Sequence, residues 1–145
     1  MPEAKLALGS VHYADILGGR TELGPEAESL LLEALEEGMM YATRFLARMY
    51  LDGLGVEQDT ERGLSAVRLG AGAGDSQLQV LLSQLYLEGR LLEEDLVQAN
   101  AWATLAAAQG EEQGQVIRQH LEQQVLSKES IRESREAALR LAAGQ

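Results

Sequence analysis

The sequence predicts an all-α protein, a right-handed α-solenoid of about four antiparallel helix pairs. A short residue pattern recurs at an offset of 36 positions, which pairs Tyr50 with Tyr86 and Gly53 with Gly89. Between the turns, apolar residues recur every three to four positions, the spacing of a helix with one buried face. A repeat period of about 20–50 residues is typical of stacked supersecondary units. Such units bury their apolar faces against their neighbours.

The first expected unit, residues 3–38, is a degenerate copy of the pattern. Its matches to the next copy shift by two positions partway through, which predicts a longer loop between its helices, from Gly18 to Pro25. Proline suits the first turn of a helix, where its missing amide costs nothing. Asp15 stands where later copies carry a glycine.

The second expected unit, residues 39–74, shows the pattern most clearly. Its first helix is expected to end at Gly53, because a left-handed cap favours a residue without Cβ. Asp59 then suits the N-cap of the second helix, since its carboxylate can accept from free backbone amides. Gly74 marks the end of that helix.

The boundaries of the third and fourth units are predicted from the same kinds of cap residue. Residues 75–110 carry Asp75 and Asp95 as expected N-caps. After Gly110 the frame slips, and residues 111–145 are expected to form a capping helix pair, because terminal units of solenoids are usually atypical. Together the units form one predicted domain over residues 1–145. The expected core includes Leu46, Tyr50, Leu82, Tyr86, Trp102 and Ala107.

The second and third units resemble the Sel1-like repeat, a branch of the tetratricopeptide superfamily. Matching positions in the second unit are Ala42, Leu46, Ala47, Tyr50, Gly53, Gly55, Val56, Asp59, Gly63, Gly70, Ala71 and Gly74. Those in the third unit are Leu82, Tyr86, Gly89, Asp95, Ala99, Trp102, Ala106, Ala107 and Gly110. The resemblance implies a non-enzymatic scaffold that binds proteins or peptides in adaptor, chaperone-like or regulatory roles.

Composition narrows the classes of partner and compartment. A net charge of −11 argues against nucleic acid and anionic membrane surfaces, since binding to phosphates needs clustered lysine and arginine. The chain lacks cysteine, which excludes disulfides, thiolate metal sites and a cysteine nucleophile. No apolar stretch reaches the ~18 residues of a membrane span. We expect a cytoplasmic protein, or a periplasmic one if an export signal has been removed.

The sequence offers no catalytic, metal or cofactor motif. His12 and His120 are far apart in the chain, whereas zinc needs three or four converging ligands. The glycine-rich run at residues 69–75 resembles a phosphate loop, but a phosphate loop follows a strand and here the run ends a helix. We therefore expect no enzyme activity, no cofactor and no metal.

Arg44 and Arg48 are the most suggestive polar pair, since residues four apart share one helix face. The resemblance implies that the first helix of each unit lines a concave side, where both arginines could hold a carboxylate or phosphate of a partner. Alternatively, they pair with carboxylates of their own chain. The predicted partner-binding residues are Tyr41, Arg44, Arg48, Leu51, Asp52, Gln77, Val80, Gln84, Leu87 and Glu88, with Leu6, Ser10 and Tyr13 added from the first unit.

Three roles fit these observations. The leading one is a protein-interaction module that engages a protein or peptide, itself a monomer or weak homo-oligomer. One alternative is an immunity or inhibitor protein that neutralises a bacterial effector enzyme. The other is a structural homo-oligomer formed by end-to-end stacking, since an uncapped solenoid end can associate.

Overall fold

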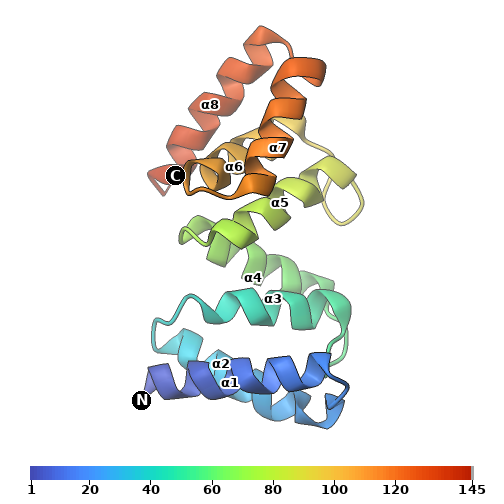
Figure 1. The fold of residues 1–145 in the computed structure, drawn as a ribbon, viewed down its shortest axis with the longest axis vertical. Helices are drawn as coiled ribbons and strands as arrows, with labels where there is room; N and C mark the ends of the chain where they lie inside the picture. The colour runs from blue at the N-terminus through green and yellow to red at the C-terminus, as the bar shows by residue number, and fades with distance from the viewer. Residues whose placement is uncertain (145) are drawn as a thin grey trace. The chain divides into compact units, whose positions relative to one another are not determined.

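The computed structural model describes residues 1–144, and all of their regular elements are helical (Figure 1). The α-helices are α1 (Pro2–Leu17), α2 (Gly24–Glu36), α3 (Ala42–Asp52), α4 (Thr60–Gly72), α5 (Ser76–Glu88), α6 (Leu96–Ala108), α7 (Glu112–His120) and α8 (Lys128–Ala142). A 3-10 turn, η1 (Thr21–Leu23), precedes α2, and a π-helical turn, η2 (Leu121–Val125), follows α7. The prediction of an all-α protein is confirmed.

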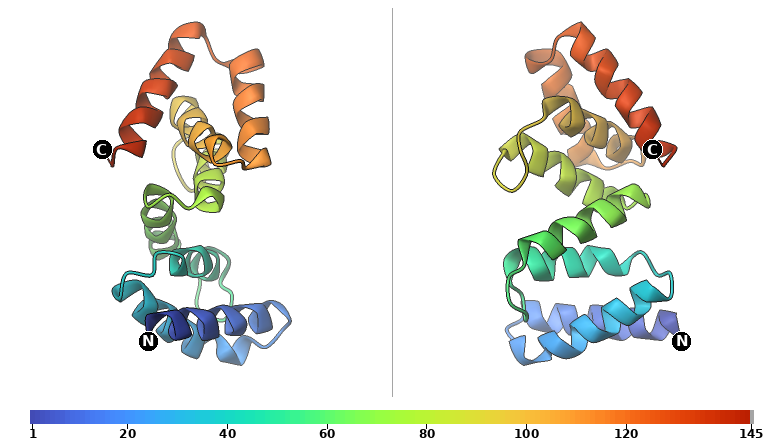
Figure 2. Two further views of the ribbon diagram at one scale, coloured as in Figure 1. Left: turned by 60° about the vertical axis from the view of Figure 1, so that its left-hand side comes forward. Right: turned by 180° about the vertical axis from the view of Figure 1, so that it is seen from behind.

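Contacts between the helices divide the chain into two compact units, residues 1–73 and the residues from Gly74 onward. In the first unit α1 packs on α2, α3 packs on α4, and α2 also contacts α3. In the second, α5 packs on α6, and α6 also contacts α7 and α8. Figure 2 shows these hairpins from two further directions. The single domain over residues 1–145 stays a prediction.

The ends of the helices follow the predicted cap chemistry. Four side chains accept a hydrogen bond from the backbone amide three residues later, at 3.0–3.1 Å: Asp59, Asp75, Asp95 and Ser127. Gly53 and Gly89 end α3 and α5 in the left-handed conformation, both with φ of 68°. Since this region of φ disfavours a side chain, glycine at these two positions sets where each helix stops.

The first repeat, residues 3–38, departs from the repeat pattern at Asp15. This residue lies inside α1, which continues to Leu17, so Asp15 does not occupy a cap position. The turn instead falls at Gly19, which has a φ of 108°, and the amide of Arg20 donates to the Asp15 carbonyl at 3.0 Å. The helix is longer because the nearest glycine that can adopt the left-handed turn lies further along the chain.

The predicted core is largely confirmed. Leu46, Tyr50, Leu82 and Trp102 are buried. Tyr86 and Ala107, however, are only half-buried. On each of their helices the residue one position earlier is buried instead: Leu85 on α5 and Ala106 on α6. On both helices the earlier predicted residue, Leu82 or Trp102, is buried as expected, and the later one gives its place in the core to the residue before it.

Candidate functional site

The predicted partner-binding residues of the first unit cluster around a row of aromatic rings. Phe45 of α3 contacts two rings edge-on, that of Tyr13 on α1 with centroids 5.2 Å apart and that of Tyr41 with centroids 5.6 Å apart. The Arg44 guanidinium lies 4.3 Å from the centre of the Tyr41 ring, and its Nη1 donates to the Tyr41 hydroxyl at 2.7 Å. We call Tyr13, Phe45, Tyr41 and Arg44 the aromatic row.

Arg48 and Asp52 flank the same row at its Tyr13 end. Burial raises the pKa of Tyr13; the Asp52 carboxylate raises it further, while the Arg48 guanidinium opposes the rise. Both charged groups are thus close enough to act on the Tyr13 hydroxyl, and both residues are exposed. The structure therefore brings Tyr41, Arg44, Arg48 and Asp52 together on the face formed by α1 and α3.

Leu51 lies elsewhere, in the packing between α3 and α4. Its side chain is only 9% exposed. A Cβ placed on Gly63 would lie 2.6 Å from the Leu51 Cδ2 atom, so the two helices meet closely at this pair. A leucine in this position stabilises the α3–α4 hairpin.

The remaining predicted partner-binding residues lie on α5, in the second unit. Gln77 and Glu88 are exposed, and Glu88 pairs with Arg90 at 3.0 Å. Gln84 and Leu87 are half-buried. Val80 is 6% exposed and belongs to the core of its unit. The exposed side of α5 is thus mainly polar.

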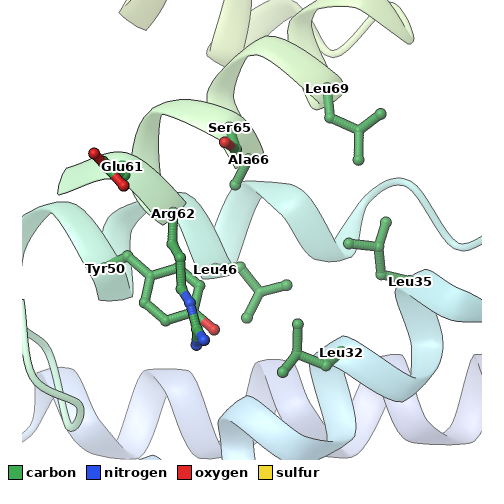
Figure 3. Close-up of a pocket in the computed structure, with 9 residues that line it drawn as sticks. All are labelled: Leu32, Leu35, Leu46, Tyr50, Glu61, Arg62, Ser65, Ala66 and Leu69. Atoms are coloured by element: carbon green, nitrogen blue, oxygen red, sulfur yellow. The ribbon is translucent and has the colours of Figure 1, made fainter. Parts of the chain in front are cut away.

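A pocket that the sequence did not predict opens in the first unit (Figure 3). Its volume is about 540 Å³. The walls come from α2 and α4, and α3 forms the floor. The lining residues are Leu32, Leu35, Leu46, Tyr50, Glu61, Arg62, Ser65, Ala66 and Leu69. The only sequence signal for it is the surplus of leucines on α2, more than one buried stripe requires.

One end of the pocket is polar and held by hydrogen bonding. The Tyr50 hydroxyl donates to Oε2 of Glu28 at 2.6 Å, and the Arg62 guanidinium lies 5.8 Å from the centre of the Tyr50 ring. Arg62 also pairs with Asp59 at 3.5 Å. Burial, followed by the hydrogen bond to Glu28, raises the pKa of Tyr50 to about 12. The hydroxyl therefore remains a proton donor at neutral pH.

Residues 1–144 show neither a metal-binding cluster nor a membrane-spanning helix. This part of the chain contains no group of three or more histidine, aspartate and glutamate residues arranged to hold a metal ion. Nor does it contain a helix with the length and apolar character that a membrane crossing requires.

Residues 41–65 and 76–111 match the family model of the Sel1 repeat. The chain is also similar, over 99% of its length, to two solved structures. One is a protective antigen present in uropathogenic Escherichia coli strains that displays an SLR fold, with 26% identity and a TM-score of 0.85. The other is a Sel1 repeat protein from Oxalobacter formigenes, with 25% identity and a TM-score of 0.74.

The chain spans 30% of the first of these proteins and 43% of the second. Among curated proteins, no sequence matches it significantly. The chain therefore carries Sel1 repeats within residues 41–111, and its likeness to the two structures supports an α-solenoid fold. Such repeat proteins are in general protein-interaction modules.

Proposed function

We propose that this chain is a non-enzymatic module that binds a protein or peptide through the α1/α3 face, as an adaptor, chaperone-like or regulatory protein. The aromatic row carries the proposal. Its members are tyrosine, phenylalanine and arginine, and Arg48 lies beside it. Aromatic residues and arginine are enriched in protein interfaces and dominate their binding energy. Tyr41 is 48% exposed, so its ring is available to a partner, and a tyrosine offers both an apolar face and a hydroxyl for contact.

The row is also organised before any partner binds. The Phe45 ring contacts both Tyr13 and Tyr41 edge-on, and Arg44 is held over Tyr41 by a ring contact and a hydrogen bond. Binding to a preformed surface loses less side-chain entropy than ordering a flexible one. The arginines add the capacity to pair with a carboxylate or phosphate. A separate surface on α5, in the second unit, is proposed to make further contacts with the partner. Its residues are Gln77, Gln84, Leu87 and Glu88.

The test is affinity capture from a lysate of the source organism, with wild-type protein compared with Arg44→Glu/Arg48→Glu. A matched control, Arg20→Glu/Arg132→Glu, makes the same charge change at two exposed arginines away from the row, with side chains 62% and 65% exposed. We expect the control to capture the partner and the first variant to lose it. Equal capture by both variants would remove the α1/α3 face from the proposal.

A second candidate role is a homo-oligomer formed through α1. The side of α1 opposite its buried face is apolar, with Leu8 45% and Val11 55% exposed, and Ala4, Ala7 and Ala14 exposed beside them. An apolar helix stripe of this kind can pack on a second copy. Light scattering tests this role: a mass that rises with concentration, and returns to the monomer in Leu8→Gln/Val11→Gln, supports it.

A further inference from the structure

We propose that the pocket between α2 and α4 is a second binding site, which takes a segment of a partner protein carrying a bulky apolar side chain next to a lysine or arginine. This site is separate from the aromatic row, since no residue is shared between them. It goes beyond the proposed function by adding a second surface and by naming the chemistry of the segment that it fits.

The apolar end of the pocket suits a large side chain. Leu32 on α2 and Leu69 on α4 are 37% and 45% exposed, and both line this cavity from opposite walls. Leu46, only 1% exposed, closes the floor between them. Figure 3 shows these leucines gathered at one end, together with Leu35. An apolar group inserted here would remove both exposed leucines from water, which is favourable in proportion to the area covered.

The polar end carries an excess of negative charge. Glu28 and Glu61 add carboxylates, whereas the one arginine, Arg62, is offset by Asp59 at 3.5 Å. Helix α2, which forms the adjoining wall, has neither lysine nor arginine, and its glutamates that contact α1, Glu26 and Glu33, lie 3.4 Å from His12 and Lys5 and do not line the pocket. A cationic side chain would therefore be attracted to this end, and an anionic one repelled. That complementarity selects a basic partner segment over an acidic one.

The two ends lie side by side in one preformed site. The hydrogen bond of 2.6 Å between Tyr50 and Glu28 joins α3 to α2, and Arg62 of α4 lies over the same ring. A volume of about 540 Å³ falls within the ~300–1,000 Å³ of typical ligand sites. Neighbouring apolar and cationic side chains are what an amphipathic helix presents at positions three or four apart.

The experiment uses the full chain and three fluorescein-labelled amphipathic peptides with the same leucine spacing. Their polar positions are all lysine, all glutamine or all glutamate. Fluorescence anisotropy should show the lysine peptide binding at least about tenfold more tightly than the glutamine peptide, a difference that 1.4 kcal/mol produces. The glutamate peptide should not bind. Failure of the lysine peptide to bind, or equal binding of all three, overturns the proposal.

Substitutions then locate the binding. Leu32→Gln and Leu69→Gln preserve the net charge, and each should weaken binding of the lysine peptide about tenfold, as loss of a central apolar contact does. Leu91→Gln and Leu139→Gln are matched controls, because those leucines are 42% and 73% exposed outside the pocket. If the pocket and control variants weaken binding of the lysine peptide equally, or if none of them weakens it, the peptide is held by general attraction to the net charge of −11. Either result contradicts the site.

Two further variants separate this proposal from the previous one. Glu28→Gln should weaken binding of the lysine peptide and leave the glutamine peptide unaffected. Arg44→Glu/Arg48→Glu should bind the lysine peptide at least as well as the wild type does. If the double variant no longer binds the lysine peptide, the peptide lies on the α1/α3 face and the pocket proposal is overturned. If the double variant binds the peptide but no longer captures the partner from lysate, that result bears only on the proposed function. Circular dichroism confirms that each variant is folded.

Discussion

The backbones of Gly24 and Gly55 meet where the first two helix pairs join. A Cβ placed on Gly24 would overlap the Gly55 carbonyl, and one placed on Gly55 would lie 2.8 Å from the Gly24 Cα atom. Gly24 begins α2, while Gly55 lies in the loop after α3 with a φ of 72°. Two turns that are far apart in the sequence thus pack at a distance that only glycine allows.

Replacing Gly24 with alanine should therefore destabilise the protein. The added methyl has only backbone to displace, so we expect a loss of about 1–3 kcal/mol or more, the usual range for overpacking. Urea denaturation measures it. Gly72→Ala is the matched control: its Cβ would meet nothing within 4 Å, and it lies in α4. The control should be neutral or more stable by up to ~1 kcal/mol. Equal midpoints for the two variants would contradict the close approach.

The left-handed caps lead to a second prediction. Gly53→Val and Gly89→Val should each lose at least ~1 kcal/mol of unfolding free energy, because a β-branched residue fits a φ of 68° poorly. Asp52→Val, at the exposed position before Gly53, should lower the unfolding free energy by less than either glycine variant does. Unchanged denaturation midpoints at both glycines would show that the caps do not set the ends of α3 and α5.

The raised pKa of Tyr50, caused first by burial and then by the hydrogen bond to Glu28, predicts how stability depends on alkaline pH. A tyrosine pKa raised from 10.0 to about 12 means that the folded state holds the phenolic proton more tightly than the unfolded state does. This contribution to stability is complete below pH 10 and is lost as the pH rises through 12. Urea denaturation at a series of pH values from 9 to 12 should show the loss.

Tyr50→Phe tests the assignment. The variant should lose about 0.5–1.5 kcal/mol near neutral pH, the net value of a typical hydrogen bond. It should also lose the tyrosinate absorbance component that titrates near pH 12. Tyr86→Phe, which removes a different tyrosine, should keep that component. A titration in Tyr50→Phe identical to that of wild type would refute the raised pKa.

In the second unit, a buried polar network should carry more stability than the surface ion pairs. The Asn100 side chain is fully buried and donates to Ser134 at 2.8 Å and to Glu122 at 3.1 Å. Glu122 also pairs with Arg118 and Arg135, at 3.3 and 3.1 Å. Asn100→Ala should cost about 1–3 kcal/mol, because its partners lose a buried hydrogen bond.

Arg132→Ala provides the comparison, since its two ion pairs with Glu129 and Glu136 are largely exposed. Exposed ion pairs are worth ~0–1 kcal/mol. We expect thermal melts to separate the two variants clearly. A larger loss for Arg132→Ala than for Asn100→Ala would contradict the importance of the network.

Much of the fold could be predicted because the ends of the helices are marked by particular residues at fixed positions of the repeat. Gly53, Gly89, Asp59 and Asp95 are local signals, each acting on its own helix end, and all four behave as expected. The side of each helix that is buried was less predictable. Tyr86 is half-buried and Leu85 buried, because residues three and four positions after the buried Leu82 both lie near its helix face, and the pattern does not show which of them is covered.

The pocket could not be predicted for a related reason. Periodicity along α2 and α4 shows which residues are apolar, but Leu32 and Leu69 form a cavity only through the spacing between two helices that are not consecutive in the chain. Leu51 illustrates the same point, since its contact with Gly63 depends on the crossing of α3 and α4. Conversely, the grouping of Arg44 and Arg48 followed from their spacing on one helix.

The central claim is that a protein partner binds the α1/α3 face, and site-specific photocrosslinking tests it most directly. p-Benzoylphenylalanine would replace Tyr41, which is 48% exposed, or, as a control, Leu139 on α8, which is 73% exposed. After irradiation in lysate of the source organism, we expect a covalent adduct of defined mass from position 41 and none from position 139. An adduct from position 139 alone, with none from position 41, would contradict the claim.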